Sequence, residues 1–226
     1  MTGRCCSKGG ESVFKAVCFD VDGVLTKIDS IWRYLHIKFN TLENAKKNAE
    51  LFRAGKISYE EWAILDASLW KGISVKDIDA CLSEIPLREY AVDLLRELKQ
   101  RGVKLIAISA GLDIVIKEIE KRSGIRFDSS YANKLIFKNG VVSGDVEVFV
   151  EYYNKGEVLT KACKELRIDP SEVISIGDSE VDIPMMKKSG FSIAFNPKSI
   201  DVLISADIAI FSEKLLPLTK LLRLLC

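Results

Sequence analysis

The chain has 226 residues, enough for one domain of ordinary size or for a core with a small accessory module. Hydrophobic residues make up 48% and charged residues 29% of the chain, which is typical of a globular protein and argues against disorder. The formal net charge is +1, so no global field attracts nucleic acid or an anionic lipid surface. We therefore expect small-molecule partners.

No segment of the sequence predicts secretion or membrane insertion. Residues 1–15 lack an apolar run of signal-peptide length, and no later segment is long and apolar enough to span a bilayer. The six cysteines include no CxxC pair and His36 is the only histidine, so we expect no zinc site. These features predict a cytoplasmic protein with neither a membrane nor a nucleic-acid partner.

A short apolar run at residues 13–19 ends at Asp20, as in a buried parallel strand that leads into a functional loop. From residue 28 to residue 84 the apolar pattern takes a helical period, with breaks at Asn40, Gly55 and Gly72. The sequence therefore predicts a small helical bundle inserted after the first strand.

Strand and helix patterns alternate after this insert, which is typical of a parallel sheet with helical crossovers. The patterns predict helices at residues 89–101, 113–122, 156–167, 183–189 and 215–225, and strands at residues 103–108, 173–176, 191–194 and 208–211. Two strand-like runs within residues 131–148 flank Asn139-Gly140. Because Asn-Gly is a strong turn signal, we predict a β-hairpin at the edge of the sheet.

The predicted fold class is α/β, with a doubly wound, Rossmann-like parallel sheet, a helical-bundle cap inserted after the first strand and a β-hairpin edge. The predicted divisions are a flexible tail over residues 1–12, a core formed by residues 13–27 and 88–226, and a cap over residues 28–87. No Walker-type or GxGxxG loop is present, so we expect no nucleotide binding through those loops.

Residues with polar or catalytic chemistry stand where predicted strands end or a helix begins. These segments are DVDGVLT at residues 20–26, SAG at 109–111, KG at 155–156 and GDSEVD at 177–182. Ligands of open α/β sheets bind outside the carboxyl ends of the strands, so we expect the four segments to meet. Each signal alone is weak, since an Asp-x-Asp sequence is usually a solvated turn. Four of them in this order predict one site.

The predicted site gathers four aspartates, Asp20, Asp22, Asp178 and Asp182, with Lys155. Two carboxylates about 5 Å apart repel by roughly 3 kcal/mol at an effective dielectric constant of about 20, so the cluster needs cations. Lys155 offsets one charge, and a divalent ion with oxygen ligands offsets two more. We expect this ion to be Mg²⁺ and the substrate to be a phosphorylated anion.

These residues resemble the motifs of the haloacid dehalogenase superfamily, with Ser109 as its small hydroxyl residue and Lys155 as its lysine. Within the superfamily, the placement of the helical insert and the hairpin segment at residues 132–147 are similar to phosphoserine phosphatases. The resemblance implies an Mg²⁺-dependent phosphomonoester hydrolase. A phosphomutase of the same superfamily and a non-catalytic phosphate-binding regulatory protein remain alternatives.

The resemblance also implies a role for each residue. Asp20 is the nucleophile that takes up the phosphoryl group, and Asp22 is the general acid and base. The phosphoryl oxygens are held by Ser109, Ala110, Gly111 and Lys155.

The metal ligands implied by the resemblance are Asp20, the backbone carbonyl of Val21, and Asp178. Asp182 supports Lys155 and the water shell of the metal, and Asp22 is expected to make no direct ligation.

Substrate choice is expected to depend on the cap. Asp29 lies where phosphoserine phosphatases place an acidic residue toward the substrate amine, but their carboxylate-binding arginine aligns with Asp66. Arg53 is a possible substitute from a neighbouring turn. With Asp29 and Asp66 both acidic, an amino alcohol phosphate is a hypothesis beside phosphoserine, and solvated surface charges are the plainer interpretation. The expected assembly is a monomer or homodimer.

Overall fold

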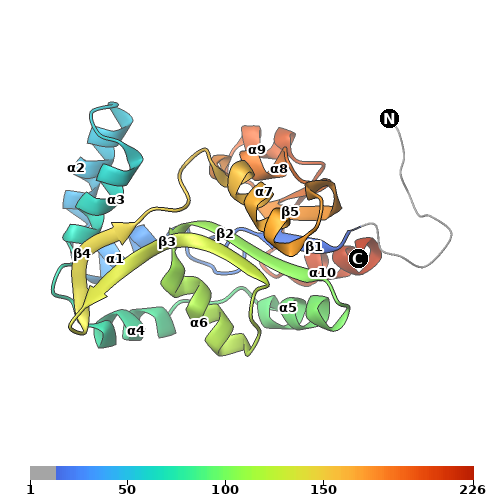
Figure 1. Ribbon diagram of the computed structural model, residues 1–226, viewed down its shortest axis with the longest axis horizontal. Helices are drawn as coiled ribbons and strands as arrows, with labels where there is room; N and C mark the ends of the chain where they lie inside the picture. Colours follow the sequence, from blue (N-terminus) through green and yellow to red (C-terminus); the bar gives the residue numbers. More distant parts are fainter. Residues whose placement is uncertain (1–13) are drawn as a thin grey trace.

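The structure is a computed structural model that describes residues 14–226, so the tail predicted for residues 1–12 lies outside the described residues (Figure 1). The core is a seven-stranded sheet with the order β4-β3-β2-β1-β5-β6-β7, in which only the β3–β4 pair is antiparallel. The strands are β1 (Ala16–Phe19), β2 (Lys104–Leu112), β3 (Ser129–Lys138), β4 (Val141–Glu147), β5 (Val173–Gly177), β6 (Phe191–Phe195) and β7 (Ile208–Ile210).

The strand order confirms the doubly wound α/β fold. β1 lies in the middle, the chain moves outward through β2 and β3 on one side, and then returns to β5 and continues outward through β6 and β7. The direction of winding therefore reverses between β1 and β5, which is where sheets of this type bind ligands. The hairpin of β3 and β4 forms one edge and turns at Asn139-Gly140, as predicted.

Helices cover both faces of the sheet. In Figure 1, α5 (Ala91–Gln100) and α6 (Asp113–Ser123) lie below it, whereas α7 (Lys155–Leu166), α8 (Ile183–Met186) and α9 (Ile200–Ser205) lie above it. α10 (Leu216–Leu225) lies beside α5, joined by an ion pair between Arg223 and Glu97. The sequence did not predict α9, because six residues are too few to show a helical period.

Four helices lie between β1 and α5, and we call residues 31–83 the inserted helices. They are α1 (Ile31–Lys38), α2 (Leu42–Arg53), α3 (Tyr59–Ser68) and α4 (Val75–Ser83). Serine side chains cap three of them: Ser30 accepts from Arg33 N–H, Ser58 forms a capping box with Glu61, and Ser74 accepts from Asp77 N–H. Such caps satisfy amide groups that the helix itself leaves unpaired.

The inserted helices differ in one respect from a single bundle. α3 packs against β4, and α2 packs against α3, but α4 packs against α6 on the lower face of the sheet. The buried side chains Ile78 and Leu82 of α4 join the same apolar cluster as Val17 and Phe19 of β1. The hydrophobic core is therefore continuous between the inserted helices and the sheet.

β2 is longer than predicted and runs to Leu112, so Ser109, Ala110 and Gly111 belong to the end of the strand and not to a loop after it. Its pairing with β3 shifts register between Ile108 and Leu112. Irregular pairing of this kind re-aims side chains, which is how one strand end can serve both the sheet and a site. Within residues 14–226, no helix has the length and apolar character needed to cross a membrane.

Candidate active site

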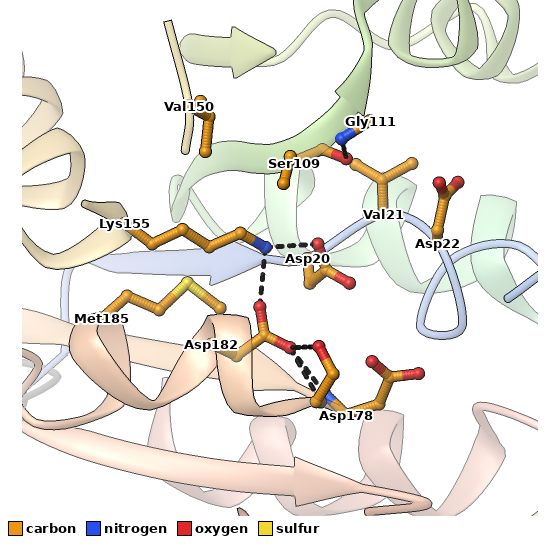
Figure 2. Close-up of polar contacts among 12 residues, drawn as sticks. Asp20, Val21, Asp22, Ser109, Gly111, Val150, Lys155, Asp178, Asp182 and Met185 are labelled. Atoms are coloured by element: carbon orange, nitrogen blue, oxygen red, sulfur yellow. Dashed lines mark hydrogen bonds and ion pairs between the residues drawn. The ribbon is translucent and has the colours of Figure 1, made fainter. Parts of the chain in front are cut away.

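The predicted site residues converge at the carboxyl ends of β1 and β5 (Figure 2). Asp20 follows β1 directly, and its N–H donates to the carbonyl oxygen of Ile176 in β5 at 2.8 Å. A pocket of about 250 Å³ opens here. Its lining includes Asp20, Asp22, Asp29, Ser109, Ala110, Gly111, Lys155 and Asp178. Asp182 lies buried beside it, in contact with Lys155.

The turn after β1 depends on a glycine. Gly23 has a φ of +84°, and a Cβ atom at this position would lie 1.9 Å from Oδ2 of Asp178. Only glycine combines this left-handed backbone with so close an approach. Gly23 therefore allows the loops after β1 and β5 to lie against each other.

Lys155, the first residue of α7, joins two carboxylates. Its Nζ lies 2.6 Å from Oδ1 of Asp20 and 2.6 Å from Oδ1 of Asp182, and the residue is 1% exposed. Burial alone would lower the pKa of this amine, but the charges and hydrogen bonds of Asp182 and Asp20 outweigh burial and raise the pKa above its ordinary value. Lys155 is therefore cationic at neutral pH.

Both oxygens of Asp182 are engaged. Oδ1 accepts from Lys155, while Oδ2 accepts from the Asp178 N–H at 2.9 Å, the Ser179 N–H at 3.0 Å and the Ser179 hydroxyl at 3.1 Å. Asp182 thus holds Lys155 and the turn after β5 in place.

Asp20 and Asp178 carry charge that the lysines only partly offset. Burial and the charge of Asp182 raise the pKa of Asp20 to about 7, although Lys155 opposes the shift. Burial and Asp182 likewise raise the pKa of Asp178 to about 6, opposed by Lys198. Carboxylate oxygens of Asp20, Asp178 and Asp182 lie within 4.8 Å of one another. A buried all-oxygen cluster with surplus negative charge fits a hard divalent cation.

The Val21 carbonyl does not fit its predicted role as a metal ligand. It accepts from the Leu25 N–H at 2.9 Å, the Thr26 N–H at 3.1 Å and the Thr26 hydroxyl at 3.4 Å. Both lone pairs of this oxygen are therefore used by the turn itself. Among the described residues, no hydrogen bond ends on the carbonyl oxygen of Asp22, the neighbouring position.

The Asp22 side chain connects the loop after β1 to the inserted helices. Its Oδ2 accepts from the N–H of Ile31, the first residue of α1, at 2.8 Å, while Oδ1 is buried without a hydrogen-bond partner in residues 14–226. Burial and the charge of Asp20 raise the pKa of Asp22 to about 7. A carboxyl group with such a pKa exchanges protons readily at neutral pH, as a general acid and base must.

The end of β2 is held by hydrogen bonds that the sequence did not reveal. The carbonyl oxygen of Ala110 accepts from Trp32 Nε1 at 3.1 Å, from the Tyr59 hydroxyl at 3.2 Å and from Asn133 Nδ2 at 3.0 Å. The N–H of Gly111 donates to Ser109 Oγ at 3.0 Å. Trp32 and Tyr59 belong to the inserted helices, so the same carbonyl ties these helices to the sheet.

Comparisons with known proteins agree with this geometry. The family model described as haloacid dehalogenase-like hydrolase matches residues 14–190. The chain belongs to this family. It is 33% identical over 213 residues to a phosphoserine phosphatase of Methanocaldococcus jannaschii, covering 92% of this chain and 98% of that protein. With such a relative along nearly its whole length, the chain is a phosphatase.

Solved structures of phosphoserine phosphatase show the same fold. A phospho-aspartyl intermediate analogue superposes with a TM-score of 0.75 at 32% identity, and a substrate-bound complex with a TM-score of 0.77 at 31% identity. In both cases the match covers 92% of this chain and 98% of the other.

Lys198 is a further residue of this haloacid dehalogenase-like hydrolase that was not predicted at the site. Lys198 places its Nζ 2.9 Å from Oδ2 of Asp178 and 3.7 Å from Oδ1 of Asp29, and its N–H donates to the Asp178 carbonyl at 2.8 Å. Lys198 follows β6, so the rule used for the other strands, which looks for polar residues after a strand end, would have found it.

The two acidic residues assigned to a substrate amine lie apart in this hydrolase. Asp29 is largely exposed at the catalytic pocket, near Lys198. Asp66 is buried in α3. Its Oδ1 accepts a hydrogen bond from Asn48 Nδ2 at 2.8 Å, and its Oδ2 lies 3.4 Å from His36 Nε2. It lines a neighbouring cavity and not the catalytic pocket. The hypothesis that both acids face one amine is therefore wrong, and so is the interpretation of Asp66 as a solvated charge.

Proposed function

We propose that this phosphatase hydrolyses phosphomonoesters of small metabolites in two displacements, through a phosphoaspartate on Asp20. The observation that carries the proposal is the buried contact in which Lys155 holds Oδ1 of Asp20, with Asp22 in the same pocket. The similarity to a structure described as a phospho-aspartyl intermediate analogue supports it.

In the first displacement, a carboxylate oxygen of Asp20 attacks phosphorus while the bond from phosphorus to the ester oxygen breaks. Asp22, protonated in part at neutral pH because its pKa is raised to about 7, gives its proton to the leaving oxygen. Lys155, Ser109 and the backbone amides at the end of β2 stabilise the charge on the phosphoryl oxygens. The products are the free alcohol and a phosphorylated Asp20.

In the second displacement, Asp22 is a carboxylate and removes a proton from a water molecule. The oxygen of this water attacks phosphorus, the bond from phosphorus to Asp20 breaks, and inorganic phosphate leaves. Asp20 is again a carboxylate and Asp22 is again protonated, so the cycle is closed.

We propose Mg²⁺ as the cofactor, held by the carboxylates of Asp20 and Asp178 and by the backbone carbonyl of Asp22. This carbonyl takes the place of Val21 and replaces the expectation that Asp22 makes no direct ligation. Asp182 supports the site through Lys155 and the turn after β5. When bound, the ion would neutralise charge on a phosphoryl oxygen that Lys155 alone does not offset. The surplus negative charge of the described cluster supports this assignment.

We further propose that the inserted helices, within the cap predicted over residues 28–87, cover the pocket and exclude water from the phosphoaspartate. Phosphoserine and related amino alcohol phosphates are the first candidate substrates, supported by the names of the relatives and by the position of Asp29 in the pocket. The cytoplasmic location and the monomeric or dimeric state stay predictions.

Release of inorganic phosphate from phosphoserine and phosphoethanolamine, with Mg²⁺ present, tests the proposal. Asp20→Asn removes the nucleophile and should abolish turnover, whereas Asp201→Asn changes an exposed aspartate on α9 and should not. Comparable turnover by Asp20→Asn would overturn the role of Asp20. Transfer of phosphate to an added alcohol, without release of phosphate, would favour the phosphomutase, and binding without turnover would favour the regulatory protein.

A further inference from the structure

α1, α2 and α3 line a second cavity, of about 320 Å³ and partly open to solvent, next to the catalytic pocket. Four residues border both spaces: Ser30, Trp32, Tyr59 and Trp62. A phosphate ester with its phosphorus at Asp20 would therefore have this cavity beside its leaving group. We call it the helical cavity.

Three aromatic rings form walls of the helical cavity, and contacts behind them fix their positions. Trp32 and Tyr59 each donate a hydrogen bond to the Ala110 carbonyl. Trp62 stacks on Phe52 with ring centroids 4.7 Å apart and meets the edge of Tyr59 at 5.8 Å. Rings held in this way offer flat apolar surfaces that need little ordering when a ligand binds.

Small residues keep the helical cavity open. Ala45 and Ala49 of α2 and Ala63 of α3 line it, and all three are buried. A leucine at any of these positions would place additional carbon atoms in or next to the open space. The volume thus depends on alanine side chains at three helical positions.

The charged groups of the helical cavity do not offer an obvious partner for a charged leaving group. Asp66 already accepts from Asn48 and lies against His36, whereas Arg33, Lys46 and Arg53 are exposed residues of the lining. Exposed charges are screened by solvent and salt. Contact inside the helical cavity therefore comes mainly from aromatic and aliphatic surfaces.

We infer that the helical cavity is a subsite for a leaving group that carries an aromatic ring. A two- or three-carbon alcohol would leave most of the space empty, whereas a ring joined to the ester carbon by a short linker would pack between Trp32, Tyr59 and Trp62. The inference rests on the proposed function, because it requires the phosphoryl group at Asp20. It concerns the size and aromatic character of the leaving group, not its amine.

The test compares phenethyl phosphate with ethyl phosphate, whose leaving alcohols have similar acidity, so that the ring is the main difference. The readout is the ratio of the two kcat/KM values. Burying additional apolar groups in a pocket commonly changes kcat/KM by tenfold or more, and we expect phenethyl phosphate to be favoured at least about tenfold. A ratio near one would overturn the inference.

Variants identify the cavity as the source of this ratio. Ala49→Leu partly fills the cavity and should lower the ratio at least about threefold, since the ring loses its space. Ala54→Leu adds the same atoms at the exposed end of α2, outside the lining, and should leave the ratio unchanged. If Ala49→Leu does not fold, Ala45→Val takes its place. An unchanged ratio in the folded cavity variant would also overturn the inference.

A binding measurement separates this inference from the proposed function. In Asp20→Asn, tryptophan fluorescence reports binding because Trp32 and Trp62 line the cavity. Tighter binding of phenethyl phosphate than of ethyl phosphate, lost in Asp20→Asn combined with Ala49→Leu, would support the subsite even if the parent released no phosphate. Phosphate release without discrimination between the esters would overturn the subsite and leave the proposed function standing.

Discussion

The side-chain amide of Asn133 donates to the carbonyl oxygen of Ala110 at 3.0 Å and so joins β3 to the end of β2. Asn133 is fully buried, and its Oδ1 accepts from the N–H groups of Phe149 and Val150, in the segment that leads to Lys155. One side chain therefore positions the strand end that carries Ser109 and the loop that precedes Lys155.

Asn133→Ala should lower both stability and turnover. The change leaves buried backbone groups without partners, at about 1–3 kcal/mol for each unsatisfied group. Chemical denaturation measures the loss, and kcat should fall because both flanking segments lose their anchor. Asn44→Ala, at an exposed position of α2, is the matched control and should change stability by less than about 0.5 kcal/mol. Parent-like values for Asn133→Ala would show that the hydrogen bonds are dispensable.

Lys155→Met should destabilise the metal-free protein strongly, because Asp20 and Asp182 lose the cation between them. Removing one member of a buried ion pair typically costs about 3–5 kcal/mol. Turnover should also be lost. Lys164→Ala, on the exposed side of α7, should behave like the parent in the same denaturation experiment. A stable Lys155→Met would mean that the two carboxylates become protonated and need no counter-charge.

Gly23→Ala should abolish activity, whereas Gly55→Ala should not. Gly23 and Gly55 both have a positive φ, +84° and +67°. An alanine at either position is therefore destabilised by about 1–2 kcal/mol, the cost of left-handed backbone for a residue with a Cβ atom. A Cβ at residue 23 would collide with Asp178, but nothing lies within 4 Å of a Cβ at residue 55. Phosphate release and melting temperature, measured for Gly23→Ala and Gly55→Ala, compare the activity and stability of the two variants. Equal behaviour of the two variants would contradict the close packing of the two loops.

The stability of the metal-free protein should fall as the pH rises from about 4 to about 7. The pKa values of Asp20 and Asp22 are raised from 3.8 to about 7 in the folded protein, so in this range the folded state binds more protons than the unfolded state. The free energy of unfolding then decreases with pH. Melting temperatures in the presence of EDTA measure the trend, and Asp22→Asn should reduce its slope. A stability that rises across this range would refute the raised pKa values.

Mg²⁺ should raise the melting temperature at pH 7, since an ion that binds only the folded state stabilises it by mass action. The increase should shrink in Asp178→Asn, which removes a proposed ligand, and should persist in Asp207→Asn, whose carboxylate accepts from Ser192 away from the cluster. Equal increases in both variants would place the ion elsewhere.

We expected polar residues after strand ends and at helix starts to meet in one site, and this was sufficient to bring together Asp20, Asp178 and Lys155. The order of strands and helices determines which loops meet. This expectation could not give the length of β2, since Ser109 and Gly111 look like loop residues and become part of a strand only through pairing with β3. The assignment of Val21 failed for a local reason: the direction of a carbonyl depends on the turn, which residue types alone do not specify.

Contacts between distant segments explain the other differences. The burial of Asp66 depends on Asn48 and His36, which come from two other helices, and no pattern in α3 reveals them. The departure of α4 from the other inserted helices likewise depends on its contact with α6.

The hydrogen bond from Ile31 to Asp22 joins the start of α1 to the proton donor of the proposed reaction. If α1 swings outward to admit a substrate, this bond has to break, and the donor loses its orientation until the helix returns. In that case, an open position of α1 and an oriented Asp22 carboxyl group would exclude each other. A phosphoryl group bound while the helices stand open would wait for closure before its ester bond is cleaved.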